Sequence, residues 1–244
     1  MKKYIVLIMA IVVSIGAYSQ TATEILEHID RNMSSDNQVI ESSMTIHGKR
    51  NSRTMTSITY TIGSEKSYTE YLSPVREKGT KMLKLTDKLW IYSPSTDRTI
   101  QISGHMLRQS VMGSDMSYED AMDDRKLNEV YDAKVIGEEE IDGQKVIVLE
   151  LKAKVDDIAY AARKIWVHKE KYISLKEELY AKSGQLLKQL TVSEVKMFDG
   201  RWYPTKMLYK DMLKKGKGTE MSIISIKFNQ DIPEYMFTKA VLKQ

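Results

Sequence analysis

Two runs of carboxylates are the residues of this 244-residue chain best suited to acid–base chemistry, namely Glu138-Glu139-Glu140 and Glu177-Glu178. Two carboxyl groups that meet about 5–10 Å apart can hydrolyse a glycosidic bond. Consecutive charges, however, usually form the solvated face of a strand and turn, and nothing in the sequence pairs one run with the other. A hydrolase is therefore the least favoured function.

Other catalytic or metal-binding patterns are missing from the sequence. The four histidines, His28, His47, His105 and His168, form no H-x-x-x-H or HExxH spacing. The chain contains no G-x-S-x-G elbow, P-loop or dinucleotide fingerprint. With no cysteine, it also has no thiol nucleophile, thiolate metal site or disulfide. The sequence predicts a protein that is not an enzyme and that holds no metal and no cofactor.

One stretch, residues 110–122, interrupts the strand-like alternation of its surroundings. Gly113-Ser114 predicts a turn, Asp115 or Ser117 can cap a helix, and acidic residues follow in the first turn. Met112, Met116 and Met122 flank this helix start. The stretch fits a lid over an apolar cavity. It also fits an ordinary crossover helix packed on a sheet, which spacing alone favours.

The elements around this stretch are mostly strands. Residues 21–33 predict an amphipathic helix with Thr23 as N-cap. Alternation begins near Val39, and the pairs Gly63-Ser64, Asp142-Gly143 and Asp199-Gly200 predict turns between strands. About 11–13 strands in sequence order exceed what a flat open sheet usually holds. We therefore expect one curved antiparallel sheet, a half-open β-barrel of about 11 strands with short helices as a lid. A closed barrel or sandwich with a solid core is the main rival. Residues 233–237 predict one helical turn that closes an edge.

The N-terminus predicts export. Lys2-Lys3 precede an apolar run and small residues, the pattern of a signal peptide with cleavage near Ser19. We expect residues 1–19 to be this peptide and residues 20–244 to form a single domain. The formal charge of +4 includes the two leader lysines, so the remaining chain is near balance, which argues against nucleic acid as a partner. A monomer is expected.

The methionine content is unusual. The chain has 15 Met and only 3 Phe, and methionine suits surfaces that accept variable apolar shapes, although at any single position it more often fills a core gap. Residues 89–92 are apolar on both faces, so the inward face is not determined by the sequence. The candidates for lining or covering a lipid cavity are Trp90, Tyr92, Ile102, Met112, Met116, Tyr118 and Met122.

Several segments resemble a known family in order and spacing. They are Tyr71-Leu72-Ser73-Pro74 with Lys78-Gly79 and Leu83, Leu89-Trp90-Ile91-Tyr92-Ser93-Pro94 with Arg98, Met112 to Asp120, Arg163-Lys164-Ile165-Trp166-Val167, and Trp202-Tyr203-Pro204. Together they resemble the outer-membrane lipoprotein-sorting proteins, the LolA/LolB-like group, with the Gly-Ser-Asp-x-Ser-Tyr-Glu-Asp core as the most specific part. The chain looks like a divergent soluble member, because it lacks the cysteine that anchors the acceptor form.

This resemblance implies a periplasmic incomplete barrel whose apolar interior takes lipoprotein acyl chains from an inner-membrane transporter to an outer-membrane acceptor. The cargo could equally be another lipid. The alternative from a different class is an interaction or sensor domain of an envelope complex, with a packed core and no ligand.

Overall fold

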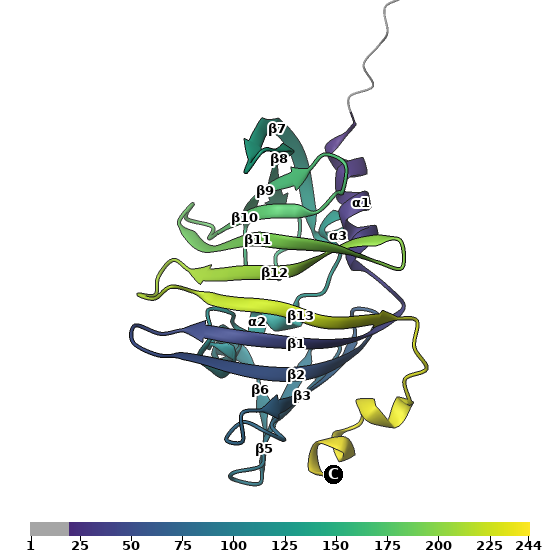
Figure 1. Cartoon of the computed structure of the whole chain (residues 1–244), viewed down its shortest axis with the longest axis vertical. Coiled ribbons are helices and arrows are strands. Elements are labelled where there is room, and N and C mark those ends of the chain that lie inside the picture. The colour runs from purple at the N-terminus through teal and green to yellow at the C-terminus, as the bar shows by residue number, and fades with distance from the viewer. Residues whose placement is uncertain (1–19) are drawn as a thin grey trace, which may run out of the picture.

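The computed structural model describes residues 20–244, and the predicted signal peptide lies outside the described residues. Thirteen strands form one antiparallel sheet (Figure 1). Its strands are β1 (Asn37–His47), β2 (Ser52–Ile62), β3 (Lys66–Ser73), β4 (Lys81–Leu85), β5 (Lys88–Ser93), β6 (Arg98–Ile102), β7 (Tyr131–Ile141), β8 (Gln144–Ala153), β9 (Ala162–His168), β10 (Ser174–Tyr180), β11 (Leu186–Phe198), β12 (Arg201–Asp211) and β13 (Thr219–Phe228).

The helices are few and short. They are α1 (Ala22–Met33), α2 (Tyr118–Met122) and α3 (Leu127–Val130), with the 3-10 turns η1 (Gly104–Arg108), η2 (Val111–Gly113), η3 (Glu234–Phe237) and η4 (Lys239–Lys243). None of the helices within residues 20–244 has the length and apolar character needed to cross a membrane. The mainly β prediction is confirmed, and the 13 strands match the upper end of the expected number.

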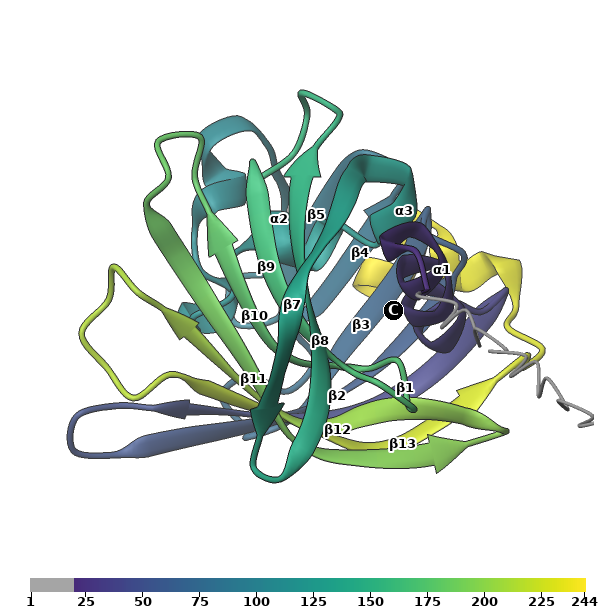
Figure 2. The ribbon, with the colours of Figure 1, turned by 90° about the horizontal axis from the view of Figure 1, so that it is seen from above.

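The strand order is β6-β5-β4-β3-β2-β1-β13-β12-β11-β10-β9-β8-β7, so nearly every strand pairs with its neighbour in sequence. The predicted turns at Gly63 and Asp142-Gly143 join β2 to β3 and β7 to β8, with both glycines at positive φ, where glycine is favoured. The exception is the β1–β13 ladder, which joins the two ends of the chain. β6 and β7 are left as the free edges, and the sheet is curved and open (Figure 2).

The centre of the sheet contains one short ladder. β12 and β13 pair only through Lys206–Tyr209 and Thr219–Ser222, although both strands continue well beyond these residues. Beyond the ladder, Tyr203 packs against Ile226 and Phe228. Side chains therefore replace backbone hydrogen bonds along part of this boundary.

Helix α1 packs its apolar side on β7–β9. Ile25, Leu26 and Ile29 are buried there against a cluster that includes Leu149 and Ile165. The prediction of Thr23 as N-cap is wrong. Thr21 caps the helix instead, because Glu24 three residues later completes a capping box: the Glu24 N–H donates to Thr21 Oγ1 at 3.2 Å, and the Thr21 N–H donates to Glu24 Oε2 at 2.8 Å.

The C-terminal segment, residues 233–244, forms the predicted turn η3 and a second turn, η4, that was not predicted. η3 contacts β3 and β4, and η4 contacts β4 and β5, so the segment lies on the sheet face rather than along the edge strand β6. Phe237, Val241 and Leu242 are buried against Leu83 and Trp90. The expectation that this segment closes an edge is thus wrong: an apolar sheet face attracts it more strongly than a short edge strand does.

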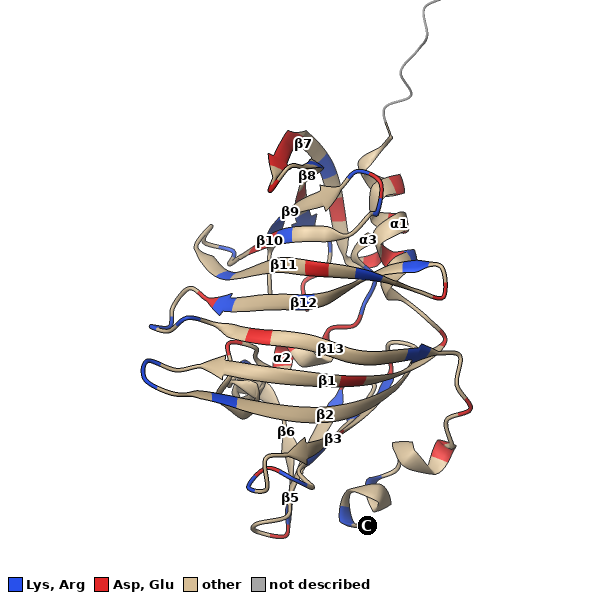
Figure 3. Cartoon of the chain, viewed as in Figure 1, with Lys and Arg blue, Asp and Glu red and all other residues tan. Residues whose placement is uncertain are grey.

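Charged residues of both signs are interspersed over the strands visible in Figure 3, apart from an acidic group at one end of β7. This distribution agrees with the near-balanced composition.

Candidate functional site

Residues 103–130, here called the lid segment, connect the two edge strands β6 and β7 and contain η1, η2, α2 and α3. Basic side chains from both halves of the sheet bind it. Arg53 on β2 donates to the Met112 carbonyl, and Lys84 on β4 donates to the Met122 carbonyl at 2.6 Å and to Asp124 at 2.7 Å. Lys188 on β11 pairs with Asp120. Contact with such distant strands places the lid segment on the concave face.

A methionine-rich cluster lies between the lid segment and β1–β6, with one residue from β13. Seven of the 15 methionines belong to it, together with aliphatic and aromatic side chains. The methionines are Met44, Met55, Met82, Met106, Met112, Met122 and Met221. Met55 is 1 % exposed. In this conformation the concave face beneath the lid is filled by the protein's own side chains.

The Gly113–Asp120 motif fastens the lid segment to the sheet through Asp115. The Asp115 N–H donates to Thr219 Oγ1 at 2.9 Å, and the Thr219 hydroxyl donates back to Asp115 Oδ2 at 2.8 Å. The Asp211 N–H donates to Asp115 Oδ1 at 3.0 Å. Thr219 is fully buried and Asp115 nearly so. Asp115 thus does not cap α2 but joins the lid segment to β12 and β13.

Ser117 is the N-cap of α2, as one of the two predicted alternatives. Its hydroxyl accepts from the Asp120 N–H at 3.2 Å, and the Ser117 N–H donates to Asp120 Oδ2 at 2.6 Å. Such a reciprocal arrangement satisfies two backbone donors that would otherwise lack a partner. Because α2 has five residues, this cap is a large part of what defines it.

Asp120 also joins the lid to the far half of the sheet. Its carboxylate accepts hydrogen bonds from Lys188 and from the Tyr160 hydroxyl. The side chains of Asp120 and Lys188 are each 12 % exposed. Burial alone would raise the pKa of Asp120, but the charge and hydrogen bond of Lys188, helped by Tyr160 and the Ser117 N–H, hold it below its usual range. The Asp120–Lys188 pair is therefore a buried ionic contact between lid and sheet.

The polar contacts continue from Tyr160 into β7–β10. Arg163 Nε donates to the Tyr131 hydroxyl at 2.8 Å, and its guanidinium lies 3.8 Å from Glu177. The Tyr131 hydroxyl in turn donates to the Tyr160 carbonyl at 3.0 Å. Beneath the lid segment, the contacts are therefore apolar against β1–β6 and polar around Tyr160, Arg163 and Lys188.

The predicted lining residues fall into two groups. Ile102, Met112, Tyr118 and Met122 belong to the methionine-rich cluster. Met116 is half-buried within the lid segment but outside that cluster; its carbonyl accepts from the Val111 N–H at 2.9 Å.

Trp90 and Tyr92 lie on the opposite face of β5, against the C-terminal segment. The side chains of β5 that face the lid are Leu89 and Ile91. Alternation along the strand requires this separation, because neighbouring residues point to opposite faces of a sheet.

The carboxylate runs are paired with basic residues rather than gathered into one site. Glu138 binds Lys169 at 2.6 Å, Glu139 accepts from Trp166 Nε1 at 2.8 Å, and Glu178 binds Lys176 at 2.7 Å. In the part of the chain that the structure describes, no three His, Asp or Glu side chains gather as metal ligands would.

Sequence reasoning missed the residues that fasten the lid from the sheet side, above all Lys188 and Thr219. The sequence pattern marks Asp115 and Asp120 only as capping or first-turn residues. The one available signal was two acidic residues within a stretch rich in methionine, which need partners if the methionines are buried. The identity of those partners depends on contacts between positions 68 or more residues apart.

Comparison with known proteins gives a consistent picture. A family model described as an uncharacterized protein matches residues 63–244. Among curated proteins, none matches the sequence significantly.

Several solved structures share the fold over nearly the whole chain. A domain assigned as an outer membrane lipoprotein-sorting protein, from Vibrio parahaemolyticus, is 26 % identical with a TM-score of 0.79, covering 91 % of this chain and 98 % of its own. A DUF1329 family protein from Desulfovibrio piger is 24 % identical, with a TM-score of 0.82 and coverage of 91 % and 97 %. A LolA superfamily protein from Nitrosomonas europaea is 24 % identical, with a TM-score of 0.76 and coverage of 91 % and 100 %.

Proposed function

We propose that this chain, which belongs to the family matched over residues 63–244, is a periplasmic carrier of acyl chains. The LolA-like fold that it shares with the solved structures supports this proposal. The cargo would be the acyl chains of lipoproteins, or another lipid, bound on the concave face beneath the lid segment and transferred towards the outer membrane. An inner-membrane transporter would supply the cargo and an outer-membrane acceptor would take it.

The methionine-rich cluster is the observation that supports this proposal. An acyl chain gains about 0.8 kcal/mol for each CH₂ removed from water. Methionine side chains can rearrange around variable apolar shapes. In the closed conformation the lid residues Met106, Met112 and Met122 occupy the space against β1–β6 that a chain would take. Loading therefore requires the lid to lift and an acyl chain to replace its apolar side chains.

The lid segment has the properties that such an exchange needs. Its helices are three to five residues long, too short to be stable when detached from the sheet. Segments of this kind open locally at a fraction of the free energy of global unfolding. The buried contacts of Asp115 and Asp120 return the lid to one closed position. No bond-making or bond-breaking step is part of the proposed activity.

A packed cluster also favours a second function, that of an envelope interaction domain whose lid stays closed. Mass spectrometry of lipids extracted from the purified native protein separates the two. Bound lipid or lipopeptide supports the carrier, whereas a lipid-free protein that also fails to bind a hydrophobic dye supports the interaction domain.

A pair of matched variants tests the position of the site. In Met112→Glu/Met122→Glu, two carboxylates enter the methionine-rich cluster, and we expect dye or lipopeptide affinity to fall at least about tenfold because a carboxylate is poorly solvated among apolar groups. The control, Met197→Glu/Met212→Glu, places the same charges at residues that are 53 % and 43 % exposed, outside that cluster. Thermal melting confirms folding. Equal affinity in the two variants would contradict a site beneath the lid.

A further inference from the structure

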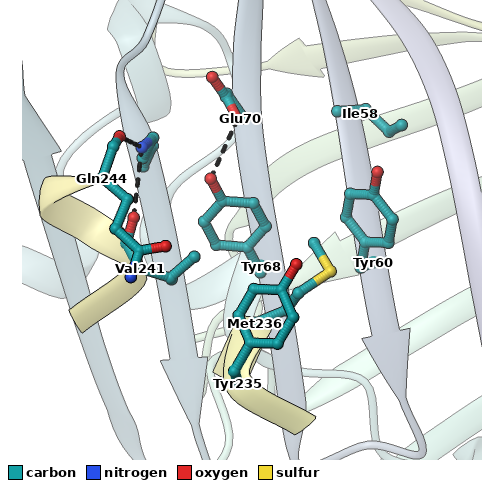
Figure 4. Close-up of a pocket in the computed structure, with 9 residues that line it drawn as sticks. Ile58, Tyr60, Tyr68, Glu70, Tyr235, Met236, Val241 and Gln244 are labelled. Atoms are coloured by element: carbon teal, nitrogen blue, oxygen red, sulfur yellow. Dashed lines mark hydrogen bonds between the residues drawn. The ribbon is translucent and has the colours of Figure 1, made fainter. Parts of the chain in front are cut away.

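A pocket lies on the outer face of the sheet, away from the lid segment. It has a volume of about 290 Å³, and its walls come from β2–β4 and from the C-terminal segment (Figure 4). The register places Tyr60 opposite Tyr68 and Glu70 opposite Lys81. Tyr235 and Met236 of η3 form the wall opposite the strands. The volume is near the lower end of the range for small-ligand sites.

Three tyrosine rings line this pocket. Tyr68 is 3 % exposed, and its ring centroid lies 6.2 Å from that of Tyr60 in a tilted arrangement. Tyr235 is 60 % exposed, although it stands beside these rings. The face of a tyrosine ring carries partial negative charge and attracts cations.

The carboxylate of Glu70 lies at the same site without a cationic partner. Its one hydrogen bond from a described side chain is donated by the Tyr68 hydroxyl at 3.0 Å, and no ion pair joins it to any Lys or Arg of residues 20–244. Lys81 is directly opposite in the ladder and would be its natural partner. Lys81 Nζ instead donates to the carbonyls of Gln244 at 2.6 Å and Val241 at 3.2 Å, so its charge is directed to the C-terminal segment.

Part of the negative charge near Tyr60 has the same origin, the carboxylate of Glu70. Burial raises its pKa, and the charges of Glu70 and Glu41 raise it further. A half-buried carboxylate next to three aromatic rings is a favourable environment for a positively charged group with a small hydrocarbon body. Lys81 also lines the pocket, but its ammonium is held by the Val241 and Gln244 carbonyls, so Glu70 is the lining charge that lacks an ionic partner within residues 20–244.

We propose that this outer pocket binds a small organic ammonium group, with the charge against Glu70 and the alkyl part against Tyr60, Tyr68 and Tyr235. The ammonium could belong to a free amine or to a phospholipid headgroup. Since Tyr235 belongs to the C-terminal segment, occupancy would also hold that segment against β3 and β4. The pocket lies on the face of the sheet opposite the lid, so it is independent of the proposed acyl-chain site.

The test is a ligand-observed NMR titration of residues 20–244 with choline, with ethanolamine, and with 3,3-dimethylbutan-1-ol, the uncharged analogue of choline. We expect choline or ethanolamine to bind and the alcohol not to bind. Sedimentation with vesicles of phosphatidylethanolamine or of phosphatidylglycerol forms a second arm. Binding to the former alone, with no free amine bound, identifies the headgroup as the source.

Variants connect the binding to the pocket. Glu70→Gln keeps the shape of the side chain and removes its charge, and we expect affinity for the ammonium probe to fall about tenfold or more. Glu194→Gln, at an exposed carboxylate of β11, should leave it unchanged. The variant Met112→Glu/Met122→Glu should also retain it, which separates this site from the lid. Equal binding of alcohol and choline, unaltered binding in Glu70→Gln, or no binding of any amine or phosphatidylethanolamine vesicle would overturn the proposal.

Discussion

Replacing Lys188 with methionine removes the cation that Asp120 faces while keeping most of the side-chain volume. Both side chains are 12 % exposed, so the remaining carboxylate cannot recover much hydration while the lid stays closed. Removal of one partner from a buried ion pair costs about 3–5 kcal/mol. Since Tyr160 and Ser117 still donate to Asp120, we expect the lower value, about 3 kcal/mol.

This free energy belongs to the closed lid, so its loss should appear first as local opening. A change of about 3 kcal/mol corresponds to roughly a hundredfold increase in the open fraction. Hydrogen exchange of the amides of α2, followed by mass spectrometry, measures this increase. The matched control is Lys196→Met, which lies on the same strand in an ion pair with Glu194 whose side chains are 59 % and 46 % exposed. Exposed pairs of this kind contribute about 0–1 kcal/mol.

The pH dependence gives an independent check. The pKa of Asp120 lies below its ordinary value of 3.8 in the folded chain, so its contribution is complete above that pH and is lost as the pH falls through the lowered pKa. The difference in exchange between wild type and Lys188→Met should therefore be largest near neutral pH and shrink as Asp120 becomes protonated. If exchange in α2 of Lys188→Met matched that of both wild type and Lys196→Met at neutral pH, the Asp120–Lys188 pair would not be what holds the lid segment on the sheet.

Three further changes test other contacts. Thr219→Val keeps the shape of the side chain but leaves the Asp115 N–H without its partner. It should destabilise the contact between the lid segment and the sheet by about 1–3 kcal/mol and speed hydrogen exchange within residues 111–116. Unchanged exchange there would show that Asp115 does not fasten the lid segment. Asp30→Ala removes the acceptor for the Leu127 and Asn128 N–H groups at 2.9 and 3.1 Å, and urea unfolding should show a loss of about 1 kcal/mol, against none for the exposed Glu27→Ala. Leu242→Ala creates a cavity at a fully buried residue beside Trp90 and should lower the free energy of unfolding by about 2–4 kcal/mol. The control Leu213→Ala, at a residue that is 63 % exposed, should not lower it. Equal stabilities of the two variants would mean that the C-terminal segment is not held on the sheet.

The sheet could be predicted from the sequence because its information is local. Alternation defined the strands, and Asp142-Gly143 and Gly63 defined hairpins whose partners are adjacent in the chain. Ser117 was recognisable as a cap because its partner, Asp120, is three residues away. Each of these features depends on short-range geometry that a residue type alone can report.

The arrangement of faces and fastenings could not be predicted in this way. Leu89 and Trp90 are equally apolar, and only the C-terminal segment, more than 140 positions later, makes the Trp90 face a buried outer surface. Nothing in the local sequence distinguishes Lys188 from other strand lysines, because its role depends on the position of the lid segment beside β11. The sequence therefore predicts the candidate site as a segment but does not identify the sheet residues that hold it.

The route of the chain makes the lid segment a link between the two sides of the half-barrel. It starts at one free margin of the sheet and ends at the other, so it spans the mouth of the half-barrel like a strap. In the middle of the sheet, β12 and β13 share only four residue pairs, so this boundary is where we expect the sheet to bend most easily. We expect the two half-sheets to spread about this line when bulky cargo enters, as far as the strap allows. The length of residues 103–130, rather than the strength of any single contact, would then limit the size of the cargo that the protein can bind.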